Sequence, residues 1–221
     1  MCNRSCIEFA QRIINREEIQ GKSVLEVGSL NINGSLRPLV EAYNPYSYIG
    51  IDILTGPGVD EICDSNEICM RFGHEKFDYI IATELIEHVR SWKITISNFK
   101  HALKSNGSIL ITTRSKGFPF HGYPYDYWRY EINDMESIFS DFHIEAIETD
   151  TLAPGLLMKA RKPPDFIEVN ITEYHLYSII KGKRTLRITD FDIGLFKIQY
   201  TIKRLLLKML PGFVLRFIRT S

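Results

Sequence analysis

The sequence contains only four cysteines among 221 residues, and their spacing does not indicate a structural metal site. Cys2 and Cys6 are four positions apart and Cys63 and Cys69 are six apart, whereas structural zinc sites commonly place two residues between paired cysteines. We therefore expect reduced thiols in a reducing, cytoplasmic compartment, and no bound metal.

The sequence also lacks a long apolar run and an excess of charge. No uncharged apolar stretch approaches the roughly 18 residues of a membrane span, and residues 1–20 show no apolar signal-peptide core. Lys+Arg and Asp+Glu are 27 each, which argues against a basic nucleic-acid-binding surface over the whole chain. The charge is unevenly distributed, because residues 1–158 have a balance of −8 and residues 159–221 a balance of +8.

Helix-like and strand-like segments alternate over most of the chain. Helical patterns cover 6–20, 35–43, 91–103 and 133–139, and β-prone segments cover 24–27, 48–51, 59–63, 77–82, 108–113, 143–148 and 155–160. Strands separated by helix-length segments indicate parallel βαβ units, so the sequence predicts an α/β fold with a doubly wound, mostly parallel sheet. Such sheets bind ligands at the carboxyl ends of their strands.

Pro163-Pro164 marks a predicted boundary, because two consecutive prolines interrupt both helices and strands. We expect residues 1–162 to form the main domain and residues 163–221 to form a basic C-terminal extension that is partly helical.

The extension contains an amphipathic helical pattern. From Leu195 onward, apolar residues recur on one face, and Lys197, Arg204 and Lys208 fall on the opposite face. Basic amphipathic helices lie on anionic membranes or dock on proteins. We favour docking on the chain's own domain, or formation of a homodimer, over peripheral membrane contact.

The loop after the first predicted strand lacks the glycine pattern of dinucleotide-binding proteins. Those proteins need G-x-G-x-x-G here, but only Gly28 and Gly34 are present, with Leu30 and Asn33 among the other positions. The Leu30 side chain would obstruct a pyrophosphate, and the Glu26 carboxylate favours a cationic ligand. The loop therefore predicts a nucleoside ligand without phosphate and with a positive centre.

Two aspartates follow the next two predicted strands. Asp52 ends the second strand, 18 positions after Gly34, where an acidic side chain can accept hydrogen bonds from both ribose hydroxyls. Asp64 follows the third strand and can contact an adenine amino group, with helix capping as an equal alternative. A turn or capping role for Asp52 is the weaker alternative.

Four segments together resemble class I S-adenosylmethionine-dependent methyltransferases. They are E-x-G-S at 26–29, Y-I-G-I-D at 48–52, F-D-Y-I-I-A-T-E-L-I-E-H-V at 77–89 and L-K-S-N-G-S-I-L-I-T-T at 103–113. They occur in the family's order and at its spacing, and the last two are most similar to the small-molecule branch called type 11.

This resemblance implies a seven-stranded sheet whose last strand is antiparallel, and S-adenosyl-L-methionine as the cofactor. Asp52 would hold its ribose and Asp64 its adenine. The cofactor-binding residues implied are Glu26, Gly28, Ser29, Asp52, Asp64, Thr83 and Glu84. The sequence departs from the family in the first loop, where Leu30 and Ile32 replace later glycines.

Glu87-His88 follows the fourth predicted strand, and His88 is a candidate base or acceptor contact. The alternative, which we favour from sequence, is a helix-start glutamate beside a histidine packed under the sheet.

The segment 117–130 (GFPFHGYPYDYWRY) is an aromatic loop after the fifth predicted strand. By resemblance, the acceptor site lies at this end of the sheet. Tyr123 and Tyr125 offer ring surfaces on which a substrate can stack. The alternative is a loop that packs over the sheet edge as a cover.

Charged side chains of the same loop are candidates for the chemistry. His121 can deprotonate an acceptor hydroxyl, with Asp126 as its orienter or as a second candidate base. Arg129 can hold a substrate carboxylate or phosphate. In the covering alternative, Asp126 and Arg129 form an internal ion pair.

Together these features predict a methyltransferase that acts on a small polar molecule or a glycan, most simply by O-methylation. The acidic main domain disfavours a nucleic-acid acceptor, because it repels phosphates. Two alternatives stay open: a nicotinamide-dependent reductase, which the missing glycines disfavour, and a methyltransferase fold without turnover that acts as a binding or membrane-associated partner.

Overall fold

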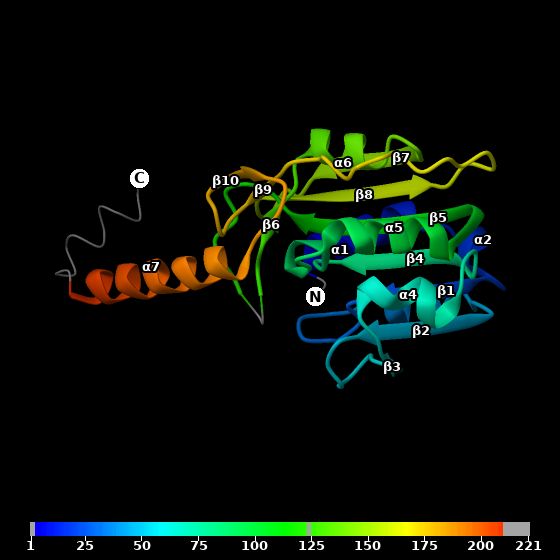
Figure 1. Ribbon diagram of the computed structural model, residues 1–221. Coiled ribbons are helices and arrows are strands. Elements are labelled where there is room, and N and C mark those ends of the chain that lie inside the picture. The colour runs from blue at the N-terminus through cyan, green and yellow to red at the C-terminus, as the bar shows by residue number, and fades with distance from the viewer. Residues whose placement is uncertain (1–2, 123–124, 210–221) are drawn as a thin grey trace.

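A seven-stranded sheet with helices on both faces forms the centre of the protein (Figure 1). The computed structural model describes residues 3–122 and 125–209. The sheet order is β3-β2-β1-β4-β5-β8-β7. The strands are β1 (Ser23–Val27), β2 (Ser47–Asp52), β3 (Glu61–Ile62), β4 (Phe77–Thr83), β5 (Leu103–Arg114), β7 (His143–Thr149) and β8 (Gly155–Arg161).

Strands β1 to β5 pair in parallel, and β8 runs antiparallel to both of its neighbours, β5 and β7. This confirms the predicted doubly wound, mostly parallel seven-stranded sheet with an antiparallel last strand. In this topology, the loops after β1, β2, β4 and β5 reach the same edge of the sheet.

The two faces of the sheet are covered by different helices. Along β4, Ile80 and Ala82 pack into the core of one face, whereas Tyr79 and Ile81 pack into the core of the other. The first core includes residues of α4 (Ile68–Phe72), α5 (Trp92–Ala102) and α6 (Ile132–Ile138), and the second includes residues of α1 (Arg4–Ile13), α2 (Arg16–Ile19) and α3 (Arg37–Glu41).

The single helix expected over 6–20 is two helices, α1 and α2. The interruption falls at Asn15, whose main-chain N–H donates to the Glu18 carboxylate at 3.2 Å. This contact starts a new helix in the manner of a capping box, a local signal that the apolar spacing alone does not contain. Two short 3-10 helices, η1 (Ser65–Glu67) and η2 (Ile86–His88), follow β3 and β4.

A second, three-stranded antiparallel sheet joins the aromatic loop to the segment after Pro163-Pro164. Its order is β10-β9-β6, with β6 (Trp128–Arg129), β9 (Leu176–Ser178) and β10 (Lys183–Thr185). Residues 163–189, which the sequence assigned to the extension, thus reach the main domain. Ile171, Leu176 and Ile188 are buried in the same core as α5.

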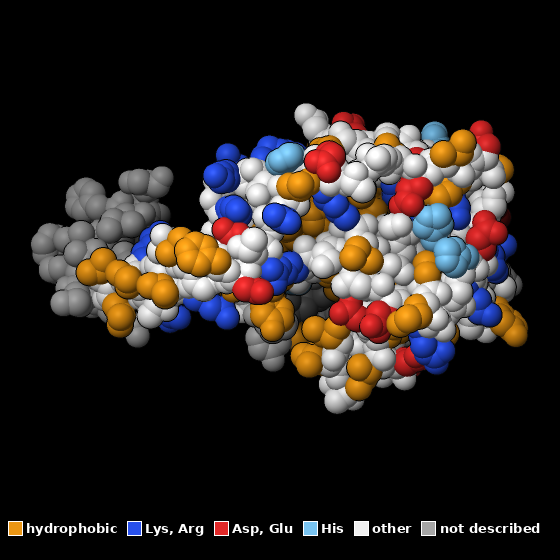
Figure 2. All heavy atoms as spheres, viewed as in Figure 1, with side chains coloured by type: hydrophobic (Ala, Val, Ile, Leu, Met, Phe, Trp, Pro, Cys, Tyr) orange, Lys and Arg blue, Asp and Glu red, His pale blue; other side chains and the backbone are white. Residues whose placement is uncertain are grey.

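Helix α7 (Asp190–Met209) projects from the body of the protein (Figure 1). Ion pairs of Asp190 with Arg90 (2.6 Å) and of Asp192 with Lys181 (3.2 Å) anchor its first turn. Hydrophobic side chains lie along the projecting helix (Figure 2); those exposed are Phe191, Leu195, Ile198, Ile202, Leu205 and Leu206. Within residues 3–122 and 125–209, no helix has both the length and the apolar character needed to cross a membrane.

Candidate functional site

A pocket opens at the carboxyl ends of β1 and β2, beside η2 and the aromatic loop. Five residues that the sequence singled out line it together: Gly28, Asp52, Asp64, His88 and Tyr125. The first three belong to the expected cofactor set and the last two to the expected acceptor set. The sheet topology therefore brings both sets to one cavity. Sequence analysis missed several further lining residues, including Ile53, Leu85, Arg90 and Tyr127.

Gly28 has a left-handed backbone conformation (φ 77°), which favours glycine. A Cβ at this position would lie 3.0 Å from Cδ1 of Leu85, so a side chain would crowd the floor of the pocket. The main-chain N–H groups of Gly28 and Ser29 both donate to the Ile51 carbonyl, at 2.9 and 3.0 Å. These bonds turn the chain sharply after β1 and leave space above the glycine.

The loop after β1 is held by the loop after β2. The Asn31 N–H donates to the Pro57 carbonyl at 2.8 Å, and Leu30 packs so close to Gly56 that a Cβ there would lie 2.4 Å from Cδ1 of Leu30. The Leu30 side chain thus packs against the loop after β2 and is not among the residues that line the pocket.

Asp52 ends β2 and faces the pocket. Its two carboxylate oxygens accept from the Leu30 N–H at 3.2 Å and the Leu54 N–H at 3.0 Å. A carboxylate has about four acceptor positions, so these bonds orient Asp52 and leave capacity for ligand hydroxyls.

Asp64 caps a short helix, which is one of the two roles that the sequence left open. Its Oδ1 accepts from the main-chain N–H of Asn66 at 2.8 Å and from its side-chain amide at 2.9 Å, which caps η1. Asp64 also lines the pocket. Capping and contact with a ligand are therefore compatible, because both capping bonds use one oxygen.

Glu26 and Ser29 are buried, with 3% and 2% of their surface exposed, and neither is among the residues that line the pocket. The Tyr48 hydroxyl donates to Glu26 Oε2 at 2.7 Å. Burial raises the pKa of Glu26 to about 7, although the hydrogen bond from Tyr48 and the charge of Arg37 act in the opposite direction.

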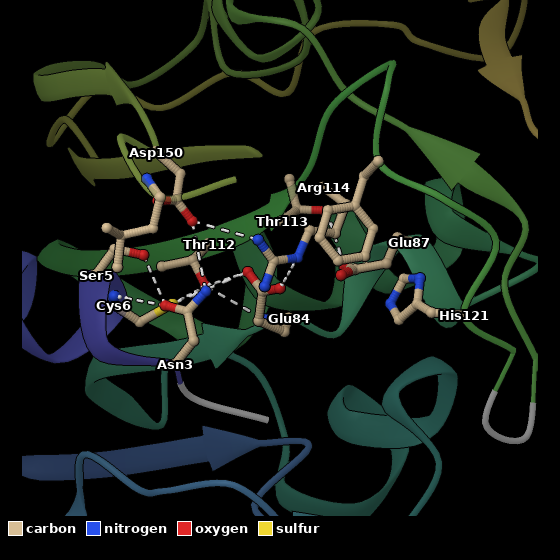
Figure 3. Close-up of polar contacts among 12 residues, drawn as sticks. Asn3, Ser5, Cys6, Glu84, Glu87, Thr112, Thr113, Arg114, His121 and Asp150 are labelled. Carbon is tan, nitrogen blue, oxygen red and sulfur yellow. Dashed lines mark hydrogen bonds and ion pairs between the residues drawn. The ribbon is translucent and has the colours of Figure 1, made fainter. Parts of the chain in front are cut away.

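Thr83 ends β4 and is buried, and Glu84, which follows it, enters a buried polar network (Figure 3). Glu84 has a left-handed backbone conformation (φ 50°), forms an ion pair with Arg114 and accepts from the Thr112 hydroxyl at 3.1 Å. Arg114 also pairs with Asp150 at 3.3 Å. Burial and the nearby Glu87 carboxylate raise the pKa of Glu84, although Arg114 opposes the rise.

Glu87 and His88 lie on η2, between this network and the pocket. Glu87 is fully buried, and its Oε2 accepts from the Thr113 hydroxyl at 2.8 Å. Its Oε1 lies 4.0 Å from Nε2 of His88. The Nδ1 of His88 donates to the carbonyl oxygen of Tyr125, so the ring is held by the aromatic loop.

His121 lies between the rings of Phe118 and His88, with centroids at 4.9 and 4.8 Å. Asp126 Oδ2 accepts from the His121 main-chain N–H at 2.9 Å and lies 2.9 Å from its Nδ1. Asp126 also forms a two-point ion pair with Arg129, at 2.5 and 2.8 Å. Although burial opposes it, the hydrogen bonds from Arg129 and His121 lower the pKa of Asp126.

Arg129 is 1% exposed and donates to the carbonyl groups of Phe118, Pro119 and Trp128 as well as to Asp126. This placement supports the alternative in which Asp126 and Arg129 form an internal ion pair. Asp126 is then an ionised orienter of His121, and Arg129 stabilises the loop.

The rings of Tyr125 and Tyr127 stack at 5.6 Å with an interplanar angle of 16° and line the pocket. Tyr123, the other expected substrate-binding tyrosine, lies outside the described residues. Tyr127 could have been found in the sequence from its position two residues after Tyr125.

Comparisons with known proteins identify the family and the fold. The sequence matches a family described as a methyltransferase domain over residues 3–152. Among curated proteins, none matches it significantly.

Solved structures with the same fold include several methyltransferases. An S-adenosylmethionine-dependent methyltransferase from Mesorhizobium loti shares 15% identity, covering 70% of this chain and 96% of its own, with a TM-score of 0.55. The 1,6-didemethyltoxoflavin-N1-methyltransferase of Burkholderia thailandensis, solved with its substrate and S-adenosylhomocysteine, shares 13% identity, covering 71% and 78%, with a TM-score of 0.57. A methyltransferase from Haloferax volcanii, described as putative and solved in complex with the Trm112 activator, shares 13% identity, covering 66% and 83%, with a TM-score of 0.53. At 13–15% identity, these similarities show that the chains share a fold.

Proposed function

Since the chain belongs to a family of methyltransferase domains, we propose that it transfers the methyl group of S-adenosylmethionine to a hydroxyl group of a small polar molecule or a glycan. The observation that carries this proposal is the shared pocket. Gly28, Asp52 and Asp64 line the same cavity as His88 and Tyr125. Donor and acceptor can therefore meet in one space, which in-line transfer requires.

The residues of the pocket fit the cofactor. Asp52 is oriented by two main-chain N–H groups and accepts the ribose hydroxyls, Asp64 accepts from the adenine amino group, and Gly28 admits the methionine end. Glu26, Ser29, Thr83 and Glu84 support these contacts from buried positions. When bound, S-adenosylmethionine supplies a methyl group already activated by its sulfonium, so the protein contributes mainly alignment.

His88 and His121 lie at the acceptor end and are the groups that receive the hydroxyl proton in this proposal. Their rings are 4.8 Å apart, and His88 lines the pocket. Asp126 holds His121 in place. The stacked rings of Tyr125 and Tyr127 offer a flat surface for a sugar or aryl ring.

Titration of the protein with S-adenosylhomocysteine and with NAD tests the cofactor. We expect S-adenosylhomocysteine to bind and NAD to bind weakly or not at all, because the loop after β1 lacks the glycine pattern of dinucleotide-binding loops. Tight NAD binding would contradict the proposal. The remaining alternative, a binding protein without turnover, predicts cofactor binding with no formation of S-adenosylhomocysteine from S-adenosylmethionine with any sugar or aryl alcohol tested.

We also propose that α7 pairs with α7 of a second copy of the chain. Among its exposed apolar residues, Leu195, Ile198, Ile202 and Leu205 are spaced by three, four and three positions, which is the seam spacing of a two-helix coiled coil, and Phe191 and Leu206 flank this seam. Phe196 contacts Phe120 of its own domain and lies outside this seam.

Light scattering coupled to gel filtration tests the pairing. We expect the unaltered chain to be dimeric and the Ile198→Glu and Ile202→Glu variants to be monomeric. Lys197→Glu, on the opposite face, leaves the dimer intact. A monomeric unaltered chain that co-sediments with anionic vesicles would favour membrane contact instead.

A further inference from the structure

Glu87, His88 and His121 form a cluster beside the pocket, and His88 also lines the pocket. One carboxylate oxygen of Glu87 and one ring nitrogen of each histidine lie within 4.8 Å of one another. Glu87 and His121 lie side by side below Arg114 (Figure 3). The three side chains come from η2 and from the aromatic loop, 33 positions apart in sequence, so the fold and not local sequence assembles the cluster.

Two atoms of the cluster face each other without a partner. In the part of the chain that the structure describes, nothing hydrogen-bonds to Oε1 of Glu87 or to Nε2 of His88. The 4.0 Å between these atoms is too long for a direct hydrogen bond. Because an unpaired carboxylate oxygen is costly in a fully buried side chain, the geometry requires an occupant that both atoms can bind.

The orientation of the histidines indicates the charge of that occupant. A carbonyl oxygen only accepts hydrogen bonds, so the Nδ1 of His88 that contacts Tyr125 carries the proton. When the ring carries only that proton, Nε2 presents a lone pair to the cluster. A carboxylate oxygen of Glu87 and this lone pair then face each other with no donor between them, an arrangement that suits a cation.

The surroundings of both rings match those of metal ligands. Metal-binding histidines commonly contact a carbonyl or carboxylate through the other ring nitrogen. His88 contacts the Tyr125 carbonyl, and Nδ1 of His121 lies 2.9 Å from the Asp126 carboxylate. Arg129 holds that carboxylate in turn.

We propose that Glu87, His88 and His121 bind one divalent cation of the first transition row, with Zn²⁺ or Co²⁺ preferred over Mg²⁺ or Ca²⁺. Two imidazole nitrogens and one carboxylate are the ligand set of open zinc sites and of two-histidine, one-carboxylate iron sites. Mg²⁺ and Ca²⁺ prefer oxygen ligands throughout. This revises the expectation from sequence that the chain binds no metal.

The ligand atoms must draw closer when the cation binds. At bond lengths of about 2.0–2.2 Å the atoms of such a site stand roughly 3 to 3.5 Å apart, less than the 4.8 Å span seen here. His121 can make this adjustment by rotation of its side chain, which is 24% exposed. Glu87 is fixed by burial and by Thr113.

The role of the cation rests on the proposed function. Three protein ligands leave open positions toward the pocket, where the cation binds the acceptor hydroxyl oxygen and lowers its pKa. With both histidines bound to the cation, the hydroxyl releases its proton to water instead of to a histidine, and an oxygen lone pair forms the new C–O bond to the methyl carbon. The C–S bond of the sulfonium breaks, and its electron pair stays on sulfur.

Titration of the untagged, metal-free protein with Co²⁺ alone tests the site without any acceptor. We expect one equivalent to bind, with the visible absorption of a low-symmetry Co²⁺ site, and Zn²⁺ to displace it. We expect Mg²⁺ at the same concentration not to displace Co²⁺. No binding by the unaltered protein would overturn the proposal and leave an ordered water as the occupant.

Variants identify the ligands. His88→Ala and Glu87→Gln should weaken Co²⁺ binding by more than about a hundredfold, since even changes around the ligands cost about ten- to a hundredfold. Glu87→Gln keeps an acceptor for Thr113, so it is the variant least expected to disturb folding. His143→Ala, an exposed histidine outside the site, is the matched control and binds normally.

Binding of S-adenosylhomocysteine by each variant shows that the fold is intact. If His88→Ala and Glu87→Gln bind Co²⁺ as well as His143→Ala does, the cluster is not the site. If the protein binds no metal but His121→Ala still slows methyl transfer, the proposed function survives and the metal does not. If metal binds but no acceptor is methylated, the metal site survives and the proposed function does not.

Discussion

The carboxyl edge of the sheet has two halves that differ in where their polar side chains lie. On one half they face the pocket, and on the other they are buried in an ion network. After β2 and β3, Asp52 and Asp64 accept from main-chain N–H groups and face the pocket. After β4 and β5, Glu84 and Arg114 neutralise each other with side chains only 5% and 9% exposed, and Asp150 joins them. A polar residue after a strand is therefore a weak sign of ligand contact, because the same position can serve a buried ion network.

The cluster of Glu87, His88 and His121 lies between these two halves. It resembles the buried network in its burial, and it resembles the pocket side in having an atom available to a ligand. Glu87 is as buried as the network. Its Oε1, however, has no hydrogen-bond partner among the described residues. Variants that remove a single charge or ring can therefore show whether that group contributes to stability or to ligand binding.

The largest effect on stability is expected from Arg114→Ala, which leaves Glu84 and Asp150 buried without their cation. Removing one partner of a buried ion pair costs about 3–5 kcal/mol. Chemical denaturation measures this loss. Arg71→Ala is the matched control, because its pair with Glu61 is exposed and such pairs contribute about 0–1 kcal/mol. Equal losses in both variants would mean that the network does not differ from surface pairs.

A smaller, pH-dependent effect is expected for Glu26. Its pKa is about 7 in the folded protein against an ordinary 4.5, so its contribution to stability is complete below about pH 4.5 and is lost as the pH rises through 7. The loss approaches about 3 kcal/mol. Glu26→Gln keeps an acceptor for Tyr48 and should reduce this part of the pH dependence. Urea unfolding of both proteins at about pH 5 and pH 8 measures the change in unfolding free energy with pH. An identical pH dependence in the two proteins would show that a group other than Glu26 causes it.

On the pocket side, Asp52→Ala should weaken S-adenosylhomocysteine binding and leave stability nearly unchanged. Losing charge-assisted hydrogen bonds costs about 1.5–3 kcal/mol, roughly ten- to a hundredfold in affinity. Calorimetric titration measures the affinity, with Asp165→Ala, at an exposed position outside the pocket, as the control. A large fall in melting temperature would show that Asp52 contributes to folding stability, as the buried network does.

The smallest effect is expected for Tyr125→Ala, which removes the ring but keeps the carbonyl that holds His88. Loss of the stacked ring costs about 0.5–1.5 kcal/mol. The acceptor KM should therefore rise up to about tenfold, with unchanged cofactor affinity. Tyr125→Phe retains the ring and should behave as the unaltered protein. A fall in kcat at constant KM would indicate that the ring acts on alignment and not on binding.

The central sheet could be predicted from sequence because each strand is a compact apolar segment bounded by turn residues. The second sheet could not: β6 has two residues, and its partner Leu176–Ser178 lies nearly 50 positions away. Pairing over such a distance leaves no periodicity in the sequence. The same distance hid the packing of Ile171 and Ile188 on the main core.

Within the site, residues placed by strand ends were predictable and partners across the fold were not. Asp52 reaches the pocket because β2 ends there. Glu84 also follows directly after a strand, but its environment depends on Arg114, 30 positions later. Side-chain type and spacing do not distinguish these outcomes, since burial and pairing are set by tertiary packing.

The ion pair of Asp126 and Arg129 has a consequence for the energetics of acceptor binding. It joins the two ends of the aromatic loop, because Asp126 holds the His121 N–H and Arg129 holds the Phe118 and Pro119 carbonyls. A loop fixed in this way loses little conformational entropy when a ligand arrives. The acceptor can then be small and make few contacts, because little of its binding free energy is consumed in ordering the loop.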